Sequence, residues 1–128
     1  MLNRGYCWGR TVGMVLAIGI FGAPASVFAA ELIVFSSKDC VVTQKFRREV
    51  AADYQRTKGG QTFHMHLVDM EKGSVGVILE EPVTMSPTFV FVDKNKEIAR
   101  ITGYPGRELF LRLTEGAADA FLEEKGAR

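Results

Sequence analysis

The sequence has few cysteines and no marked excess of charge. Only two of its 128 residues are cysteines, Cys7 and Cys40. Sixteen basic residues face 15 acidic ones, which gives a formal net charge of +1. This balance argues against a nucleic-acid partner, because proteins that bind nucleic acid carry a basic face.

The N-terminal segment has the pattern of an export signal. Two arginines and no acidic residue accompany an uncharged apolar run over residues 11–22. Pro24 breaks the run, and Ala29 ends a stretch that suits a signal peptidase. We therefore expect residues 1–29 to be a cleaved signal peptide and residues 30–128 to be one periplasmic domain that is not bound to the membrane. The alternative is an uncleaved anchor, because the uncharged stretch is nearly long enough to span a bilayer.

One cysteine remains after such a cleavage. Export to an oxidising compartment usually favours paired cysteines, but residues 30–128 contain only Cys40. The mature chain therefore cannot form an internal disulfide, and any disulfide of Cys40 must be with another molecule. We expect a monomer, and the alternative is a dimer linked through Cys40.

Hydrophobic periodicity and turn residues predict strands and helices in alternation. The expected elements are a strand at 32–35, a helix at 40–57 stopped by Gly59-Gly60, strands at 62–68, 89–92 and 97–102, and a helix at 107–125. Residues 69–79 are expected to be a loop with one or two helical turns. The last helix should bury a stripe formed by Leu109, Phe110, Leu113, Ala117, Phe121 and Leu122.

Three features of this chain resemble the thioredoxin superfamily. They are Cys40 after a strand, Ser86-Pro87-Thr88 before a strand, and the turn over residues 103–106 before the last helix. The pattern is most similar to the small periplasmic thioredoxin-like and regulatory proteins associated with bacterial sulfur oxidation. The resemblance implies an α/β fold, a thioredoxin-like three-layer sandwich with a four-stranded mixed sheet and helices on both faces.

Cys40 is the candidate nucleophile. A thiol in the first turn of a helix faces unpaired backbone N–H groups and the positive end of the helix dipole, which favour the thiolate. Lys38 would add to this effect, whereas Asp39 would oppose it unless it points away to cap the helix. The alternative is a small buried core residue.

The chain departs from the redox-active members of the superfamily at two positions. Those members carry Cys-x-x-Cys, but the second thiol is replaced here by Thr43. A threonine hydroxyl can donate a hydrogen bond to the thiolate of Cys40 but cannot attack a mixed disulfide. The superfamily also tends to have an acidic residue six positions before the first cysteine, where this chain has Val34.

The resemblance gives Ser86 and Pro87 a substrate-binding role. It implies a cis bond before Pro87, facing the thiol, and a backbone at Ser86 that pairs with an extended substrate. The alternative is an ordinary proline at the start of a strand.

A copper site is a further hypothesis. His64 and His66 share a strand face, and with Met65, Met70 and Cys40 they supply ligands that suit copper. Met65 should point the opposite way, however, and a second thiol near Cys40 is missing. We expect no metal and no other cofactor.

The leading functional hypothesis is monothiol exchange. Cys40 would attack a disulfide, and a protein or a low-molecular-weight thiol such as glutathione would resolve the product. The alternatives are a thioredoxin-fold binding or regulatory module without turnover and, third, a periplasmic metal carrier.

Overall fold

A computed structural model describes residues 30–72 and 75–127. The expected signal peptide and its cleavage site lie outside these described residues. Among the helices that the structure describes, none is both long enough and apolar enough to cross a membrane.

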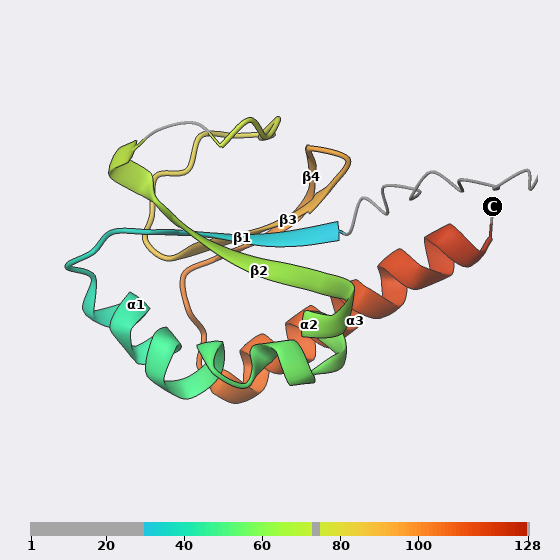
Figure 1. Cartoon of the computed structure of the whole chain (residues 1–128), viewed down its shortest axis with the longest axis horizontal. Coiled ribbons are helices and arrows are strands. Elements are labelled where there is room, and N and C mark those ends of the chain that lie inside the picture. The colour runs from blue at the N-terminus through green and yellow to red at the C-terminus, as the bar shows by residue number, and fades with distance from the viewer. Residues whose placement is uncertain (1–29, 73–74, 128) are drawn as a thin grey trace, which may run out of the picture.

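The chain is built around a four-stranded mixed sheet (Figure 1). The strands are β1 (Ala30–Ser36), β2 (Phe63–Asp69), β3 (Thr88–Asp93) and β4 (Lys96–Thr102), in the order β2-β1-β3-β4. β1 runs parallel to β2 and antiparallel to β3, and β3 and β4 form a hairpin. The central strands β1 and β3 are buried on both faces, which explains their continuous apolar runs. The four-stranded mixed sheet expected from the sequence is confirmed.

Helices cover one face of this sheet (Figure 1). They are α1 (Val41–Phe46), the π-helix η1 (Arg47–Ala51), the 3₁₀-helix η2 (Tyr54–Arg56), α2 (Lys58–Thr62) and α3 (Arg107–Gly126). The prediction of one regular helix over residues 40–57 is therefore wrong. Its buried face was expected to carry an apolar residue at every fourth position, namely Val42, Phe46, Val50 and Tyr54. The last three are buried, but Val42 is 42% exposed. The prediction that Gly59-Gly60 stops a helix is also wrong, because both glycines lie inside α2.

Close packing explains the two glycines. A Cβ atom on Gly59 would lie 2.8 Å from Oγ1 of Thr114 on α3, and one on Gly60 would overlap the carbonyl group of Tyr54. Only glycine therefore lets α2 approach both neighbours so closely. Gly59 and Gly60 are thus contact points between helices and not the end of a helix.

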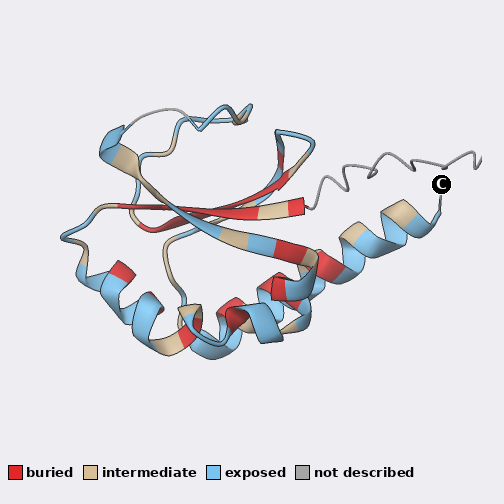
Figure 2. Cartoon of the chain, viewed as in Figure 1, coloured by how far each residue is buried: buried red, intermediate tan, exposed pale blue. Residues whose placement is uncertain are grey.

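An aromatic cluster fills the space between the sheet and these helices. The ring centroids of Phe46, Phe89 and Phe110 lie 4.6–5.3 Å apart in tilted or edge-to-face pairs, and none of the three is exposed. Figure 2 shows the buried residues concentrated on the central strands and along the helix faces turned toward them. This core fixes the position of α1, and with it the position of Cys40.

The buried stripe of α3 is narrower than the sequence predicts. Of the expected residues, Phe110 is buried and Ala117 and Phe121 are partly buried, but three leucines are 42–49% exposed, namely Leu109, Leu113 and Leu122. The buried row is instead Phe110, Thr114 and Ala118. Thr114 escapes a hydrophobicity pattern because it is polar, and its hydroxyl is satisfied by the carbonyl of Leu111 at 2.9 Å.

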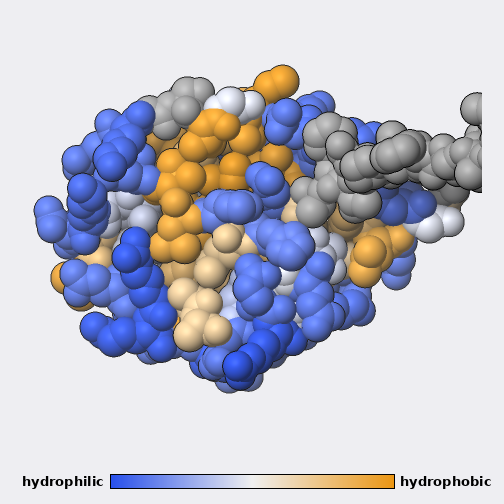
Figure 3. Space-filling view, in the orientation of Figure 1, coloured by the Kyte–Doolittle hydropathy of each residue, from blue (hydrophilic) through white to orange (hydrophobic). Residues whose placement is uncertain are grey.

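The opposite face of the sheet is covered by the connection between β2 and β3. Four side chains of the sheet, Ile33, Phe35, Val90 and Val92, pack there against Met70, Val77, Leu79 and Val83. Of the described residues in this connection, only the 3₁₀-helix η3 (Met70–Lys72) is helical. This layer is mostly loop, so the helical layer expected on this second face is reduced to η3. Figure 3 shows a hydrophobic patch at the upper centre of the view, with hydrophilic atoms on both sides of it, whereas the helical side is largely hydrophilic.

A buried carboxylate holds this loop to the hairpin. Glu97 on β4 accepts a hydrogen bond from the N–H of Glu80 at 2.8 Å and pairs with the guanidinium of Arg100. These bonds, led by the one from Arg100, keep the pKa of Glu97 below its usual range.

Candidate active site

Cys40 lies at the junction between the sheet and the helical layer. β1 ends at Ser36, and Cys40 is the N-cap residue of α1, with its N–H donating to the carbonyl of Ser37 at 3.3 Å. The thiol is free and partly exposed, so it is not the buried core residue that the sequence analysis left open. A partner disulfide can therefore reach it.

Hydrogen-bond donors favour the ionised form of this thiol. They lower the pKa of Cys40 from its ordinary value of 9.0 to about 7, with the backbone N–H of Thr43 contributing most. The hydroxyls of Ser86 and Thr43 and the N–H of Val42 act in the same direction, while partial burial opposes them. A substantial fraction of Cys40 is consequently thiolate at neutral pH, and the thiolate is the nucleophilic form.

Thr43 and Ser86 form one polar cluster beside the thiol. Thr43 is only 2% exposed, and its hydroxyl lies 3.3 Å from the Ser86 hydroxyl. The Ser86 hydroxyl also accepts a hydrogen bond from the N–H of Ser37 at 2.9 Å. The protonated thiol of Cys40 donates to the Ser86 carbonyl at 3.4 Å. On ionisation that bond is lost, and the sulfur is stabilised by the N–H of Thr43 together with the two hydroxyls.

The loop that carries Ser86 is anchored to the hairpin. The Ser86–Pro87 peptide bond is cis and Pro87 is buried. The Thr88 hydroxyl donates to the carbonyl of Met85 at 2.6 Å, and the N–H of Gly103 donates to the carbonyl of Pro87 at 2.8 Å. The structure thus brings Cys40, Thr43 and Ser86 into contact, and Pro87, the fourth site residue expected from the sequence, follows Ser86 in the same loop.

Three other residues considered from the sequence have a smaller part in this site. Val34 of β1 is fully buried in the core, at the position where the superfamily tends to have an acidic residue. The ammonium of Lys38 lies 3.8 Å from a carboxylate oxygen of Asp69 on β2. Asp39 is exposed and does not cap the helix, because Cys40 is the N-cap residue and no side chain makes a capping bond.

An apolar rim around the thiol was missed by the sequence analysis. Val41, Val42 and Met85 are 73%, 42% and 52% exposed, and they are the chain neighbours of Cys40 and Ser86. Large exposed apolar side chains that flank a reactive group mark a contact surface. The one sign of this rim in the sequence is Val41, an apolar residue that does not belong to the expected row of Val42, Phe46, Val50 and Tyr54.

The two histidines lie away from Cys40 and are exposed on the edge strand β2. His64 and His66 pair in register with Glu31 and Ile33, whereas Cys40 follows the other end of β1. Met65 points to the core, as expected. The described residues include no group of three or more histidine, cysteine or acidic side chains that could hold a metal ion.

Comparison with known proteins agrees with this geometry. A family model for the thioredoxin-like domain matches residues 29–118. The chain belongs to the thioredoxin-like family. The periplasmic thioredoxin SoxS from Paracoccus pantotrophus, in its reduced form, is a structural relative with 30% identity and a TM-score of 0.63, over 70% of this chain and 98% of that one. The thioredoxin of Fasciola hepatica shares the fold, with 23% identity and a TM-score of 0.50, over 71% and 82% of the two chains. No curated protein matches the chain.

The thioredoxin-like fold and the cysteine at the start of its first helix are consistent with thiol–disulfide exchange. The site supplies an accessible sulfur and donors that stabilise its anion. Among the described residues, Cys40 is the sole cysteine, and the neighbouring hydroxyls cannot replace a second thiol.

Proposed function

We propose that this protein performs monothiol thiol–disulfide exchange through Cys40. The thiolate attacks one sulfur of a substrate disulfide, a new S–S bond forms to Cys40, and the other sulfur leaves as a thiolate. An external thiol, from a small molecule or a second protein, then attacks the mixed disulfide and releases Cys40. The observation that carries the proposal is the partly exposed thiol with a pKa of about 7.

Thr43, Ser86 and Pro87 have supporting roles in this proposal. The buried Thr43 hydroxyl stabilises the thiolate and cannot resolve a mixed disulfide. The backbone at Ser86 and the adjoining Pro87 position the substrate, because the Ser86 carbonyl already lies within hydrogen-bond distance of the sulfur. The reaction needs no metal or cofactor.

We further propose that the chain is exported with cleavage after Ala29 and acts in the periplasm as a monomer. The apolar segment before Ala29 supports this, and one structural relative is a periplasmic thioredoxin. We also propose a role beside the proteins of bacterial sulfur oxidation, because the chain resembles the small periplasmic proteins associated with that process. The mass of the native protein checks the first point, because a stable full-length form would contradict cleavage.

Replacing Thr43 with cysteine tests the exchange proposal. Side chains three positions apart at a helix start lie about 5–6 Å apart at Cβ, and a disulfide needs about 3.5–4.5 Å, so a small backbone shift closes it. We expect the wild type to accumulate mixed disulfides. The Thr43→Cys variant should release them and gain dithiol reductase activity at least about tenfold, since it supplies the resolving thiol. Peptide mapping locates the new disulfide, and insulin reduction measures the activity.

Thr43→Ser is the matched control, because it keeps the hydroxyl and should leave the trapping unchanged. The missing acid at Val34 could slow proton transfer, so Val34→Asp is added to Thr43→Cys as a second variant. If neither variant forms the internal disulfide or reduces insulin, the exchange proposal fails. The apolar rim of Val41, Val42 and Met85 would then favour a binding or regulatory module that uses the same groove without turnover.

A further inference from the structure

A small cavity opens beside the thiol loop, at the carboxyl ends of the parallel strands β1 and β2. Its volume is about 180 Å³, and its walls are Ser36, Lys38, Arg47, Leu67, Val68, Asp69 and Lys72. Sites for drug-sized ligands start at about 300 Å³. The cavity therefore suits a small group, such as a carboxylate or sulfonate with a few attached atoms.

The walls of this cavity carry a net positive charge. Three of the wall residues are cationic and one, Asp69, is acidic. Both oxygens of Asp69 already have neighbours, because one accepts from the N–H of Glu71 at 3.0 Å and the other lies 3.8 Å from Lys38. Arg47 and Lys72 form no ion pair with any carboxylate that the structure describes. Their charges remain available to an anion.

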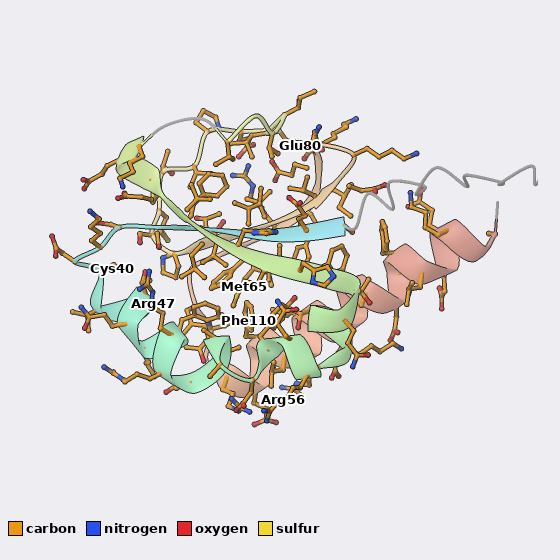
Figure 4. All side chains as sticks on the ribbon, in the orientation of Figure 1. Cys40, Arg47, Arg56, Met65, Glu80 and Phe110 are labelled. Carbon is orange, nitrogen blue, oxygen red and sulfur yellow. The ribbon has the colours of Figure 1, made fainter. Side chains whose placement is uncertain are left out.

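Chain connectivity places the cavity next to the nucleophile. Lys38, in the wall, precedes Cys40 by two residues, and two residues span at most about 7 Å. Arg47 comes from η1, which continues the helix that Cys40 caps. Figure 4 shows Cys40 and Arg47 at the same end of the molecule, where β1 passes into α1. Cys40 is not itself a wall residue, so a substrate with its anionic group in the cavity needs an arm of several bonds to bring its sulfur to Cys40.

We propose that this cavity binds the anionic group of a small sulfur substrate and so makes Cys40 selective for low-molecular-weight disulfides with carboxylate or sulfonate arms. The inference rests on the proposed exchange function and names its substrate class. Cys40 attacks one sulfur of the bound disulfide and forms an S–S bond to it, and the other half leaves as a thiolate with its own anionic arm. Nothing is oxidised or reduced beyond this exchange.

Three small disulfides of similar size test the selectivity. They are the dianion 3,3′-dithiodipropionate, the neutral bis(2-hydroxyethyl) disulfide and the dication cystamine. Rates of mixed-disulfide formation at Cys40 are measured on the full chain at pH 7 and low salt, by peptide mapping, and divided by the rates for N-acetylcysteine. We expect the normalised rate for the dianion to exceed that for the dication about tenfold, and 0.5 M salt to reduce this ratio strongly.

The double variant Arg47→Gln/Lys72→Gln tests whether the cavity causes the preference for the dianion. Both residues are exposed, so the fold should be retained. The ratio between dianion and dication should fall to within about threefold. Any accompanying rise in the Cys40 pKa slows all three reagents alike and leaves the ratio unaffected. Arg48→Gln is the matched control, since Arg48 is an exposed arginine of the same helix outside the cavity and should preserve the wild-type ratio.

Alkylation separates failure of this inference from failure of the exchange proposal. Iodoacetate and iodoacetamide differ in charge but hardly in size, and both react with a thiolate with loss of iodide. The double variant should lower the iodoacetate-to-iodoacetamide rate ratio at Cys40 about fivefold, and Arg48→Gln should not. If Cys40 exchanges with none of the disulfides but shows this change, the exchange proposal fails and the anion site stands. If the double variant has the same dianion-to-dication ratio and the same iodoacetate-to-iodoacetamide ratio as the wild type, the anion site is refuted.

Discussion

Replacing Thr43 with valine tests the electrostatic basis of the site most directly. Valine keeps the shape of the buried side chain but removes the hydroxyl that faces Ser86 and stabilises the Cys40 thiolate. The backbone N–H of Thr43, which contributes most to the low pKa, is retained. The variant therefore removes one donor from the sulfur and leaves the rest of the cluster in place.

The size of the effect follows from the loss of one hydrogen bond to an anion. Such a bond stabilises an ion by about 1.5–3 kcal/mol, and the partial exposure of Cys40 reduces this to about 1 kcal/mol. That free energy raises the pKa of Cys40 by somewhat less than one, from about 7 toward 8. At pH 7 the thiolate fraction then falls from about one half to about one sixth, while the more basic thiolate becomes about twofold more nucleophilic.

These opposing effects predict rate profiles that cross. Compared with the wild type, Thr43→Val should react with iodoacetamide about 1.5-fold more slowly at pH 7 and about 2.5-fold more slowly at pH 6. It should react about twofold faster at pH 10, where both thiols are ionised. Rates from pH 5 to 10, with peptide mapping to resolve Cys40 from Cys7, provide the measurement. Thr43→Ser should keep the wild-type midpoint near 7. A valine variant that is slower at every pH would refute the reasoning, because it would show loss of structure instead of loss of a donor.

Two further predictions concern the scaffold, and urea unfolding measures both. Gly60→Ala should destabilise the fold by about 3 kcal/mol or more, because the new methyl group overlaps the Tyr54 carbonyl. Gly116→Ala, in open space on α3, should instead stabilise the fold by up to about 1 kcal/mol. Equal effects of the two substitutions would contradict the packing argument. Glu97→Gln should cost about 3 kcal/mol at pH 7, since it leaves the Arg100 charge without its partner. The folded-state pKa of Glu97 is lowered, so the ionised carboxylate stabilises the fold above the unfolded pKa near 4.5. This stabilisation is lost as the pH falls through the folded-state pKa. If the free energy of unfolding of the variant depended on acidic pH as that of the wild type does, this argument would be wrong.

The strands could be predicted from the sequence because their residues are buried in a simple pattern. The runs that end at Phe35 and Val92 are apolar at every position, since central strands are covered on both faces. The helical layer was harder to predict. Whether Gly59-Gly60 ends a helix or lets it pack depends on how close Tyr54 and Thr114 come in three dimensions, and no local pattern contains that distance.

The candidate site also has one part that could be predicted from the sequence and one part that could not. Cys40, Thr43 and Ser86 could be selected because the resemblance connects two loops that are 46 residues apart, and the structure brings these loops together. The cationic cavity was missed, although Lys38 was considered. Arg47 and Lys72 are exposed positions on different elements, and only the folded chain brings them into the walls of one cavity.

The loss of the second thiol changes what the surroundings of Cys40 have to do. A dithiol site resolves its own mixed disulfide. A site with Thr43 in place of the second cysteine needs two external molecules, a disulfide that forms the mixed disulfide and a thiol that resolves it. Two chemically different surfaces adjoin the sulfur, the exposed apolar rim that includes Val41 and Met85 and the cationic cavity at Arg47. In our proposal, apolar contact suits a protein partner and the cavity suits a small anionic one. Mutation can therefore separate the reactions with these two kinds of partner. Substitutions in the cavity should slow exchange with small anions and leave the trapping of proteins unchanged.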